Sequence, residues 1–288
     1  MADGAKTFTD FALRRGDNDA TKKWGGVTHA SDAGSPVKDL QAALAGVGVY
    51  DVGQDGDFGG QTETAVRRFQ WNVGTVKGRV VNGAFAAAEP NPAINVSGVA
   101  DAATAQELKK CVDAGAQTTG NLVRVKVAAF PQFIREFKHI DNPTVEADDM
   151  LVDAGFIKSL AALHKAAEDA KVKLFITQAF RIAGAPVGGA VVTPATKSQH
   201  LIGHAIDCNI LDGDERISSE TFKHGQQTAN AKKFVQGAKT AGLRWGGDFN
   251  TADFVHFDDF VDPNGEGYLM RYFFNQRMIS KENPIPAA

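Results

Sequence analysis

A short run of small and polar residues, DAGAQTTGN at Asp113–Asn121, most constrains how this chain of 288 residues folds. Gly, Asp, Thr and Asn in close succession break helices and strands and are typical of linkers between domains. Before the run, apolar residues recur at helical spacing, whereas after it helical and alternating patterns are mixed. The sequence therefore predicts two domains, a small helical one and a larger one of the α+β class.

Three helix signals define the first domain. Ser35 stands at an N-cap position, Pro36 fits the first helical position, and the apolar residues that follow share one helical face. A second helix follows the turn DGDFGG, and Asp101 can cap a third in DAATAQELKKC. The Gly- and Pro-rich segment Val73–Ser97 is predicted to be an inserted loop with room for a short hairpin.

The second domain combines both kinds of periodicity. Residues 148–170 (DDMLVDAGFIKSLAALHKAAEDA) predict an amphipathic helix, and KVKLFITQAFR and DFVHFDDF predict strands. The stripe of that helix consists of Phe156, Leu160, Leu163 and Ala167. We expect a polar arm at 1–32, a three-helix domain at 33–115, and an α+β domain with a small antiparallel sheet at 116–288.

Composition narrows the class of protein. The net charge of −3 gives no basic field for nucleic acid, and no apolar run reaches the roughly 20 residues of a membrane span. Cys111 and Cys208 form no metal-binding or disulfide pattern and are predicted to be free thiols. The polar N-terminus lacks the apolar core of a signal peptide. We therefore expect synthesis in the cytoplasm as a soluble monomer.

The segment SQHLIGHAIDCNI crowds four metal-binding residue types together: His200, His204, Asp207 and Cys208. The two histidines have the spacing of a helical pair, but no Glu follows His200, and Gly203 favours a turn before a strand. In an extended AIDCNI, Asp207 lies on the face opposite Cys208, which is expected in the core. From the residues alone, a hydrogen-bonded structural pair is favoured over a metal site.

Three motifs add a family resemblance. SQHLIGHAID follows the pattern S-x-H-x-x-G-x-A-x-D, LRWGGDFNTADFVHFD holds W-G-G-D and then D-x-x-H, and QAFR ends a predicted strand. In this order they resemble the VanY-like D-alanyl-D-alanine carboxypeptidases and the phage L-alanyl-D-glutamate endopeptidases, which are zinc peptidases. The resemblance implies one zinc ion per chain, held by His200, Asp207 and His256. It also implies Asp253 as general base and Arg181 as the group that stabilises the carbonyl oxygen.

The neighbours of these residues have simpler expectations. Because residues three apart face opposite sides of a strand, Asp253 is predicted to lie in a bend before the strand of His256. His204 is expected beside the site or in solvent rather than as a ligand. Asp258 and Asp259 are predicted to form a solvated edge, with orientation of His256 as the alternative.

The first domain carries a second resemblance. It has L-Q and then D-G-x-F-G-x-x-T-x-x-A-V-x-x-F-Q, and it resembles the peptidoglycan-binding domain of cell-wall hydrolases. Phe58 in this motif is predicted to be a core residue rather than a platform for a sugar ring. The matching residues are Leu40, Gln41, Asp55, Gly56, Phe58, Gly59, Thr62, Ala65, Val66, Phe69 and Gln70.

Together the resemblances imply a modular peptidoglycan peptidase that binds glycan through its first domain and cleaves stem peptides with its second. Because the base is Asp253 where carboxypeptidases usually have Glu, we expect cleavage of the L-Ala–D-Glu bond. The expected role is that of a phage endolysin, released from the cytoplasm to act on the wall. The alternatives are a D-alanyl-D-alanine carboxypeptidase, a secreted wall-degrading effector, and a non-catalytic wall-binding protein.

Overall fold

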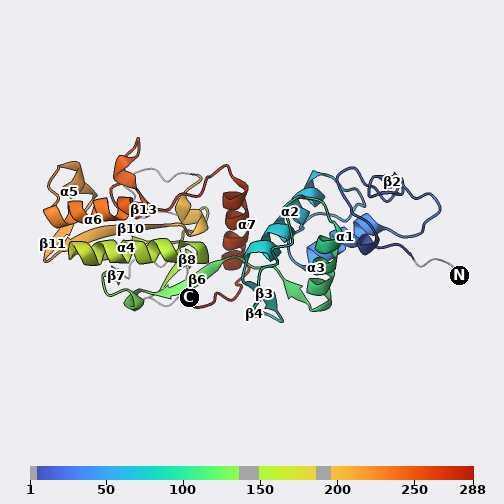
Figure 1. Cartoon of the computed structure of the whole chain (residues 1–288), viewed down its shortest axis with the longest axis horizontal. Helices are drawn as coiled ribbons and strands as arrows, with labels where there is room; N and C mark the ends of the chain where they lie inside the picture. The colour runs from blue at the N-terminus through green and yellow to red at the C-terminus, as the bar shows by residue number, and fades with distance from the viewer. Residues whose placement is uncertain (1–4, 136–148, 186–195) are drawn as a thin grey trace. The chain divides into compact units, whose positions relative to one another are not determined.

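The computed structural model describes residues 5–135, 149–185 and 196–288 (Figure 1). The chain divides into two compact units, and the boundary lies between Gly120 and Asn121. In the described residues, no helix is both long and apolar enough to cross a bilayer. The architecture mixes helices with small sheets, as the α+β prediction requires.

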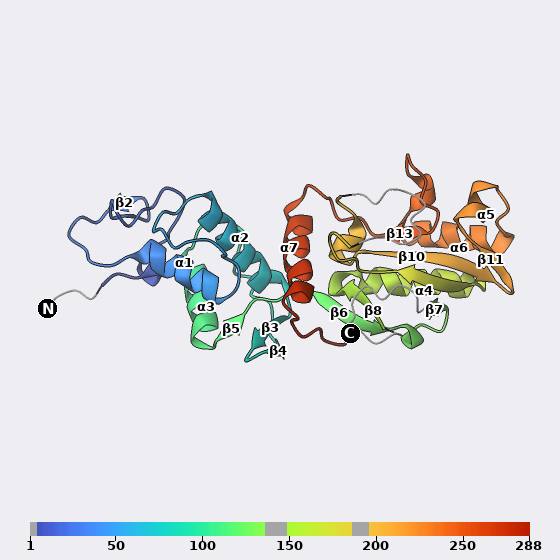
Figure 2. The ribbon, with the colours of Figure 1, turned by 180° about the vertical axis from the view of Figure 1, so that it is seen from behind.

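The first unit is built on three helices, α1 (Pro36–Gly46), α2 (Gly60–Thr75) and α3 (Ala102–Asp113), which pack together (Figure 2). Ser35 holds the N-cap position of α1 without a side-chain capping bond, whereas Asp101 caps α3 by accepting from the Thr104 N–H at 2.8 Å. Phe58 is 0% exposed, which confirms its predicted place in the core.

The predicted insertion contains a hairpin, β3 (Gly78–Val81) and β4 (Ala84–Ala87), joined through Asn82 and Gly83, both with positive φ. This pair suits a tight hairpin turn. The strand β5 (Ala116–Gln117) pairs with β3, so residues 116–120 lie with the first unit.

The described part of the predicted polar arm, residues 5–32, packs into the first unit. It holds a 3₁₀ turn at Phe8–Asp10 and two short paired strands, β1 (Lys23–Trp24) and β2 (Val27–Thr28). Leu13 and Trp24 are fully buried, and the core contacts that they gain explain why this polar-rich segment is ordered.

The second unit is centred on one sheet with the strand order β12-β13-β10-β9-β7, with β11 paired to β10. Its long strand β10 lies antiparallel to both β9 and β13. The prediction of an antiparallel sheet is wrong for β7, which runs parallel to β9 because the chain crosses over through α4. The strands are β7 (Phe133–Arg135), β9 (Lys173–Gln178), β10 (Ala205–Asp212), β11 (Glu215–Ile217), β12 (Arg244–Trp245) and β13 (His256–Asp258).

The helices α4 (Ile157–Ala170) and α6 (Ala229–Thr240) pack on each other and on β9 and β10 (Figure 1). The short α5 (Ser219–Lys223) precedes α6. The predicted helix at 148–170 is wrong at its start, because Asp149–Asp153 forms the strand β8. This strand pairs with β6 (Leu122–Lys126), and ladder hydrogen bonds outweigh the helical periodicity there.

The helix α7 (Glu266–Ser280) was not predicted, because its aromatic and polar residues follow no clear amphipathic stripe. Its buried Asn275 donates from Nδ2 to the Asp153 Oδ2 at 2.9 Å and to the Ile202 carbonyl at 3.0 Å, and its Oδ1 accepts from the Asn121 N–H. The helix thereby ties β8, the linker end and the turn that contains His200 to one another.

We predict that Asn275→Ala destabilises the fold by several kcal/mol, because a buried polar group left unpaired costs about 1–3 kcal/mol. Urea unfolding of the variant should show a lower midpoint with an unchanged slope. The matched control is Leu269→Ala on the same helix, where the side chain is 50% exposed. Equal midpoints for the two variants would contradict the role of Asn275.

Candidate metal centre

Three side chains of the second unit converge on one point. The His200 Nε2 lies 3.0 Å from the Asp207 Oδ1 and 3.1 Å from the His256 Nδ1, which is itself 3.2 Å from the same carboxylate oxygen. All three belong to a group with the geometry of a metal site. The structure therefore brings together the three side chains that the motif resemblance implied as ligands.

The outer nitrogens of both histidines are already bonded to acceptors. The His200 Nδ1 lies 2.6 Å from the Ala179 carbonyl, and the His256 Nε2 lies 2.8 Å from the Asp258 Oδ2. Because these oxygens accept, both outer nitrogens must carry hydrogen, and the inner nitrogens of neutral rings carry lone pairs. Two lone pairs and a carboxylate that face one another repel unless a cation lies between them.

A zinc ion fits this donor set. Ligands bonded to tetrahedral zinc at about 2.0–2.1 Å lie about 3.3 Å from one another, close to the three distances found. Two imidazoles and one carboxylate are also the ligand types of catalytic zinc sites, which keep a fourth position for water.

Local structure explains how the ligands meet. His200 lies on a 3₁₀ turn (Gln199–Ile202) that ends at Gly203 with φ +78°. A Cβ at Gly203 would lie 2.5 Å from the Asp153 backbone nitrogen, so a larger residue would push the turn away from β8. Asp207 and His256 are direct partners across β10 and β13, which puts their side chains on one face.

A β-bulge lies beside Asp207. Asp207 pairs with Gln178 and the next residue pairs with Ile176, so Thr177 is the extra residue of β9. Bulges of this kind re-aim side chains near functional sites. The core face of the strand is as predicted, since Ile206, Cys208 and Ile210 are at most 2% exposed.

Asp253 lies in the bend before β13, as predicted, and its carbonyl accepts from the His256 N–H at 3.1 Å. Burial and then repulsion from Asp207 raise the pKa of Asp253. Gly246 makes this bend possible, because a Cβ there would lie 2.1 Å from the Asp253 carbonyl oxygen. The first glycine of W-G-G-D thus permits a close backbone approach.

Arg181 follows β9 and is 8% exposed. Its backbone N–H donates to the His200 carbonyl at 2.9 Å, and its Nη1 donates to the Gln178 Oε1 at 3.3 Å. The guanidinium therefore lies beside the residue that pairs with Asp207.

The other metal-binding residue types of the segment have separate partners. Burial raises the pKa of the Cys208 thiol, so its reactive thiolate form is suppressed. His204 is 4% exposed and lies outside the metal group, with its Nδ1 2.8 Å from Asp259 and its Nε2 3.3 Å from Asp153. It is a buried neighbour of the site and not a solvent-exposed residue.

The prediction of a solvated acidic edge is wrong for Asp258. Its side chain is 0% exposed and contacts His256 and Arg244, because strand pairing places Arg244 opposite it. Sequence reasoning overlooked Arg244, although its position directly before W-G-G-D in a strand could have indicated a cross-strand partner.

Opposite charges perturb the site strongly. Burial opposes the ionised form of Asp207, but His200 and His256 outweigh it and lower the pKa of that carboxyl. Burial would likewise lower the pKa of His256, but Asp207 and Asp258 raise it to about 9. In the absence of a metal, a proton on His256 therefore neutralises the converging donors.

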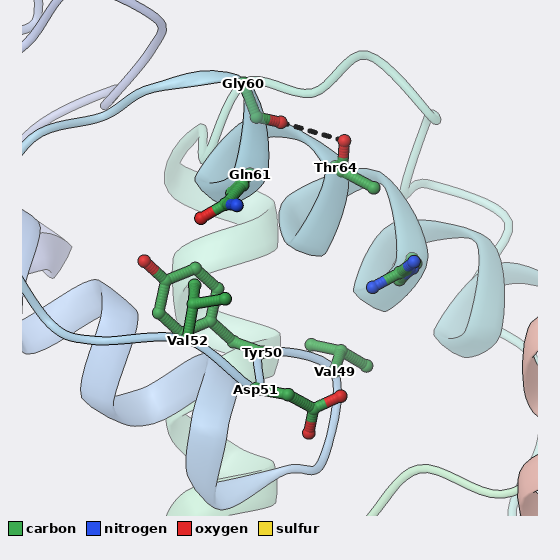
Figure 3. Close-up of a pocket in the computed structure, with 8 residues that line it drawn as sticks. Val49, Tyr50, Asp51, Val52, Gly60, Gln61 and Thr64 are labelled. Atoms are coloured by element: carbon green, nitrogen blue, oxygen red, sulfur yellow. Dashed lines mark hydrogen bonds between the residues drawn. The ribbon is translucent and has the colours of Figure 1, made fainter.

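The first unit has a separate surface feature, a cavity of about 530 Å³ (Figure 3). On one side lies the loop after α1, with Tyr50, Asp51 and Val52, and on the other the exposed face of α2, with Gln61 and Thr64. The remaining lining residues are Val49, Gly60 and Arg68.

Comparison with protein families matches both units. Residues 192–259 match the D-alanyl-D-alanine carboxypeptidase family, and residues 33–76 match a peptidoglycan binding domain family. No curated protein matches the chain. The matches define the class, a modular peptidoglycan hydrolase. More particularly, the second unit is of the metallopeptidase type and the first carries the peptidoglycan-binding segment.

We predict that zinc binding to the metal-free protein releases about one proton per ion near pH 7. The affinity should rise about tenfold per pH unit up to about pH 9, because zinc must displace the proton of His256. Calorimetric titrations in buffers of different ionisation enthalpy measure this release. The same proton stabilises the metal-free fold fully below pH 6.5, and that contribution is lost as the pH rises through about 9.

The matched controls for this titration are His200→Ala, which should lose zinc, and Cys208→Ser, which should keep it. Loss of zinc from a folded Cys208→Ser protein would show that the ligand set is wrong.

Proposed function

We propose that the protein is a zinc-dependent peptidase that hydrolyses the L-Ala–D-Glu bond of peptidoglycan stem peptides. The observation that carries the proposal is the convergence of His200, Asp207 and His256 on one point. The outer nitrogens of the two histidines are already hydrogen-bonded, so their inner nitrogens face this point. The family match at 192–259 supports the reaction class. The match at 33–76 supports the substrate.

In this proposal, zinc held by the three ligands supplies Lewis acidity and makes water a stronger acid. Asp253 accepts a proton from the attacking water, and its raised pKa makes it a stronger base than an ordinary aspartate. Arg181 donates hydrogen bonds to the carbonyl oxygen as negative charge develops there. Asp253 then returns the proton to the leaving amine, so that the C–N bond breaks and a carboxylate and an amine remain.

The choice of bond rests on the motif around His256. W-G-G-D followed by Asp253 resembles the endopeptidases, whereas the carboxypeptidases usually have Glu as base. The description of the matched family favours release of D-alanine instead, and this is the second candidate reaction. The two reactions give different products, a new N-terminal D-Glu or free D-alanine.

We further propose that the cavity of the first unit binds the glycan strand. In α2, the motif residues Thr62, Ala65, Val66 and Phe69 are buried, whereas residues at four variable motif positions line the cavity: Gly60, Gln61, Thr64 and Arg68. Val52 and Tyr50 offer apolar surface for an acetyl methyl group, and Gln61 and Thr64 offer polar groups for its amide and the sugar hydroxyls.

The proposed biological role is that of an endolysin, made in the cytoplasm and released to the wall at host cell lysis. A wall-binding unit joined to a stem-peptide hydrolase suits that role. The role of a secreted wall-degrading effector needs the same two activities. The two roles differ in how the protein reaches the wall. Lysis of cells that co-express the protein with a membrane-permeabilising holin, but not without one, tests the release step.

We predict that Asp253→Asn lowers kcat on purified peptidoglycan by at least about a hundredfold with zinc still bound, because the base is lost. Mass spectrometry of the digest identifies the new termini. The matched control is Asp214→Asn in the exposed turn between β10 and β11, which should keep full activity. Release of D-alanine by the wild type would replace the proposed bond with the second candidate, and zinc-loaded wild type without products would exclude both.

We predict that Gln61→Trp reduces sedimentation of the protein with insoluble peptidoglycan, because the indole fills the cavity. Gln106→Trp on α3 is a matched control, since Gln106 is also exposed on a helix of this unit but does not line the cavity. The fraction bound is measured at several wall concentrations. Equal binding of both variants would place the glycan site elsewhere on the unit.

A further inference from the structure

Asp258 is a buried carboxylate whose two oxygens are both fixed. The Oδ2 accepts from the His256 Nε2 at 2.8 Å and from the Arg244 Nη2 at 2.7 Å. The Oδ1 accepts from the Arg244 Nε at 2.7 Å and from the Phe260 N–H at 3.0 Å. Two parallel bonds to one guanidinium hold a carboxylate in a single orientation.

Arg244 is itself held in place from three sides. The pairing of β12 with β13 sets it opposite Asp258. Its guanidinium carbon lies 4.1 Å from the ring centroid of Phe260 and 5.1 Å from that of Phe249. Phe260 has φ +48°, a rare conformation for a bulky residue, and its N–H bond to Asp258 stabilises this backbone. The orientation of Asp258 is therefore set before any ligand is bound.

The fixed orientation of Asp258 determines which tautomer His256 adopts. A neutral imidazole carries its hydrogen on either nitrogen, and the two forms differ little in energy without a neighbour. An ionised carboxylate only accepts, so Asp258 favours the form with hydrogen on Nε2 and a lone pair on Nδ1. That lone pair faces His200 and Asp207. The other tautomer would direct a hydrogen at the metal position.

We infer that Asp258 and Arg244 are positioning residues that select the Nδ1-coordinating tautomer of His256. The inference rests on the proposed zinc site. It argues for the alternative role that the sequence offered for Asp258 and adds Arg244, and neither residue is a defined position of W-G-G-D or D-x-x-H. Neither residue belongs to the group of converging donors. Both act through His256.

The decisive variant is Asp258→Asn. It keeps the shape of the side chain, but Arg244 and the Phe260 N–H both need its remaining carbonyl oxygen. The amide NH₂ is then directed at the His256 Nε2, where it favours the wrong tautomer. We expect zinc affinity, measured by competition with a chelator, to fall about 10- to 100-fold.

Two further measurements separate positioning from folding. NMR of cadmium-113-loaded, ¹⁵N-labelled protein should show coupling to the His256 Nδ1 in the wild type, and its loss or transfer to Nε2 in Asp258→Asn. Urea unfolding of the metal-free proteins shows how far stability changes. Should Asp258→Asn not fold, Arg244→Lys keeps the charge, loses the paired hydrogen bonds and should bind zinc several-fold more weakly than the wild type.

The matched control is Asp259→Asn. Asp259 is the adjacent carboxylate, but it contacts His204 and Ser159 instead of His256, so zinc affinity should stay within about twofold of the wild type. If Asp258→Asn bound zinc with wild-type affinity and unchanged Nδ1 coupling, the inference would be overturned and the proposed function would stand. A wild type that binds no zinc would instead overturn the proposed function.

Discussion

The site depends on one register, the pairing of Asp207 with His256 across the antiparallel strands β10 and β13. Directly opposed residues share a face, so this register alone brings a carboxylate and an imidazole into contact. A shift of β10 by one residue would turn Asp207 to the other face and bring Cys208 and Ile206 out of the core. The buried residues of β10 therefore fix the register that brings Asp207 and His256 together.

His200 needs a different device, because it lies on a turn outside the sheet. Its Nδ1 bonds to the Ala179 carbonyl, and α7 bonds to the turn through Asn275. Gln276 of the same helix donates to the Leu201 carbonyl and to that of Arg181. Polar side chains on α7 thus hold the two loops that carry His200 and Arg181, so the site is ordered by contacts distant in sequence.

The sequence singled out the three side chains that converge because they belong to short motifs whose spacing is fixed by local geometry. Alternation in AIDCNI placed Cys208 in the core, and the structure confirms it. Features that depend on pairing between strands distant in sequence could not be predicted in this way. Residues 149–153 have helical periodicity, yet β6 makes them a strand. Asp258 looked solvent-exposed in sequence, and only the pairing of β12 with β13 shows that Arg244 meets it.

In the first unit, the residues that define the motif are not the residues exposed on its surface. The Gln41 Nε2 donates to Asp55 and Thr62, and its Oε1 accepts from the Gly56 N–H, so this motif glutamine holds the turn before α2. Gln70 makes comparable bonds to Thr104 and the loop before α3. Motif residues that are occupied in this way build the scaffold. In the proposed binding of glycan, recognition falls to the exposed positions between them, where substitution can change what is bound without loss of the fold.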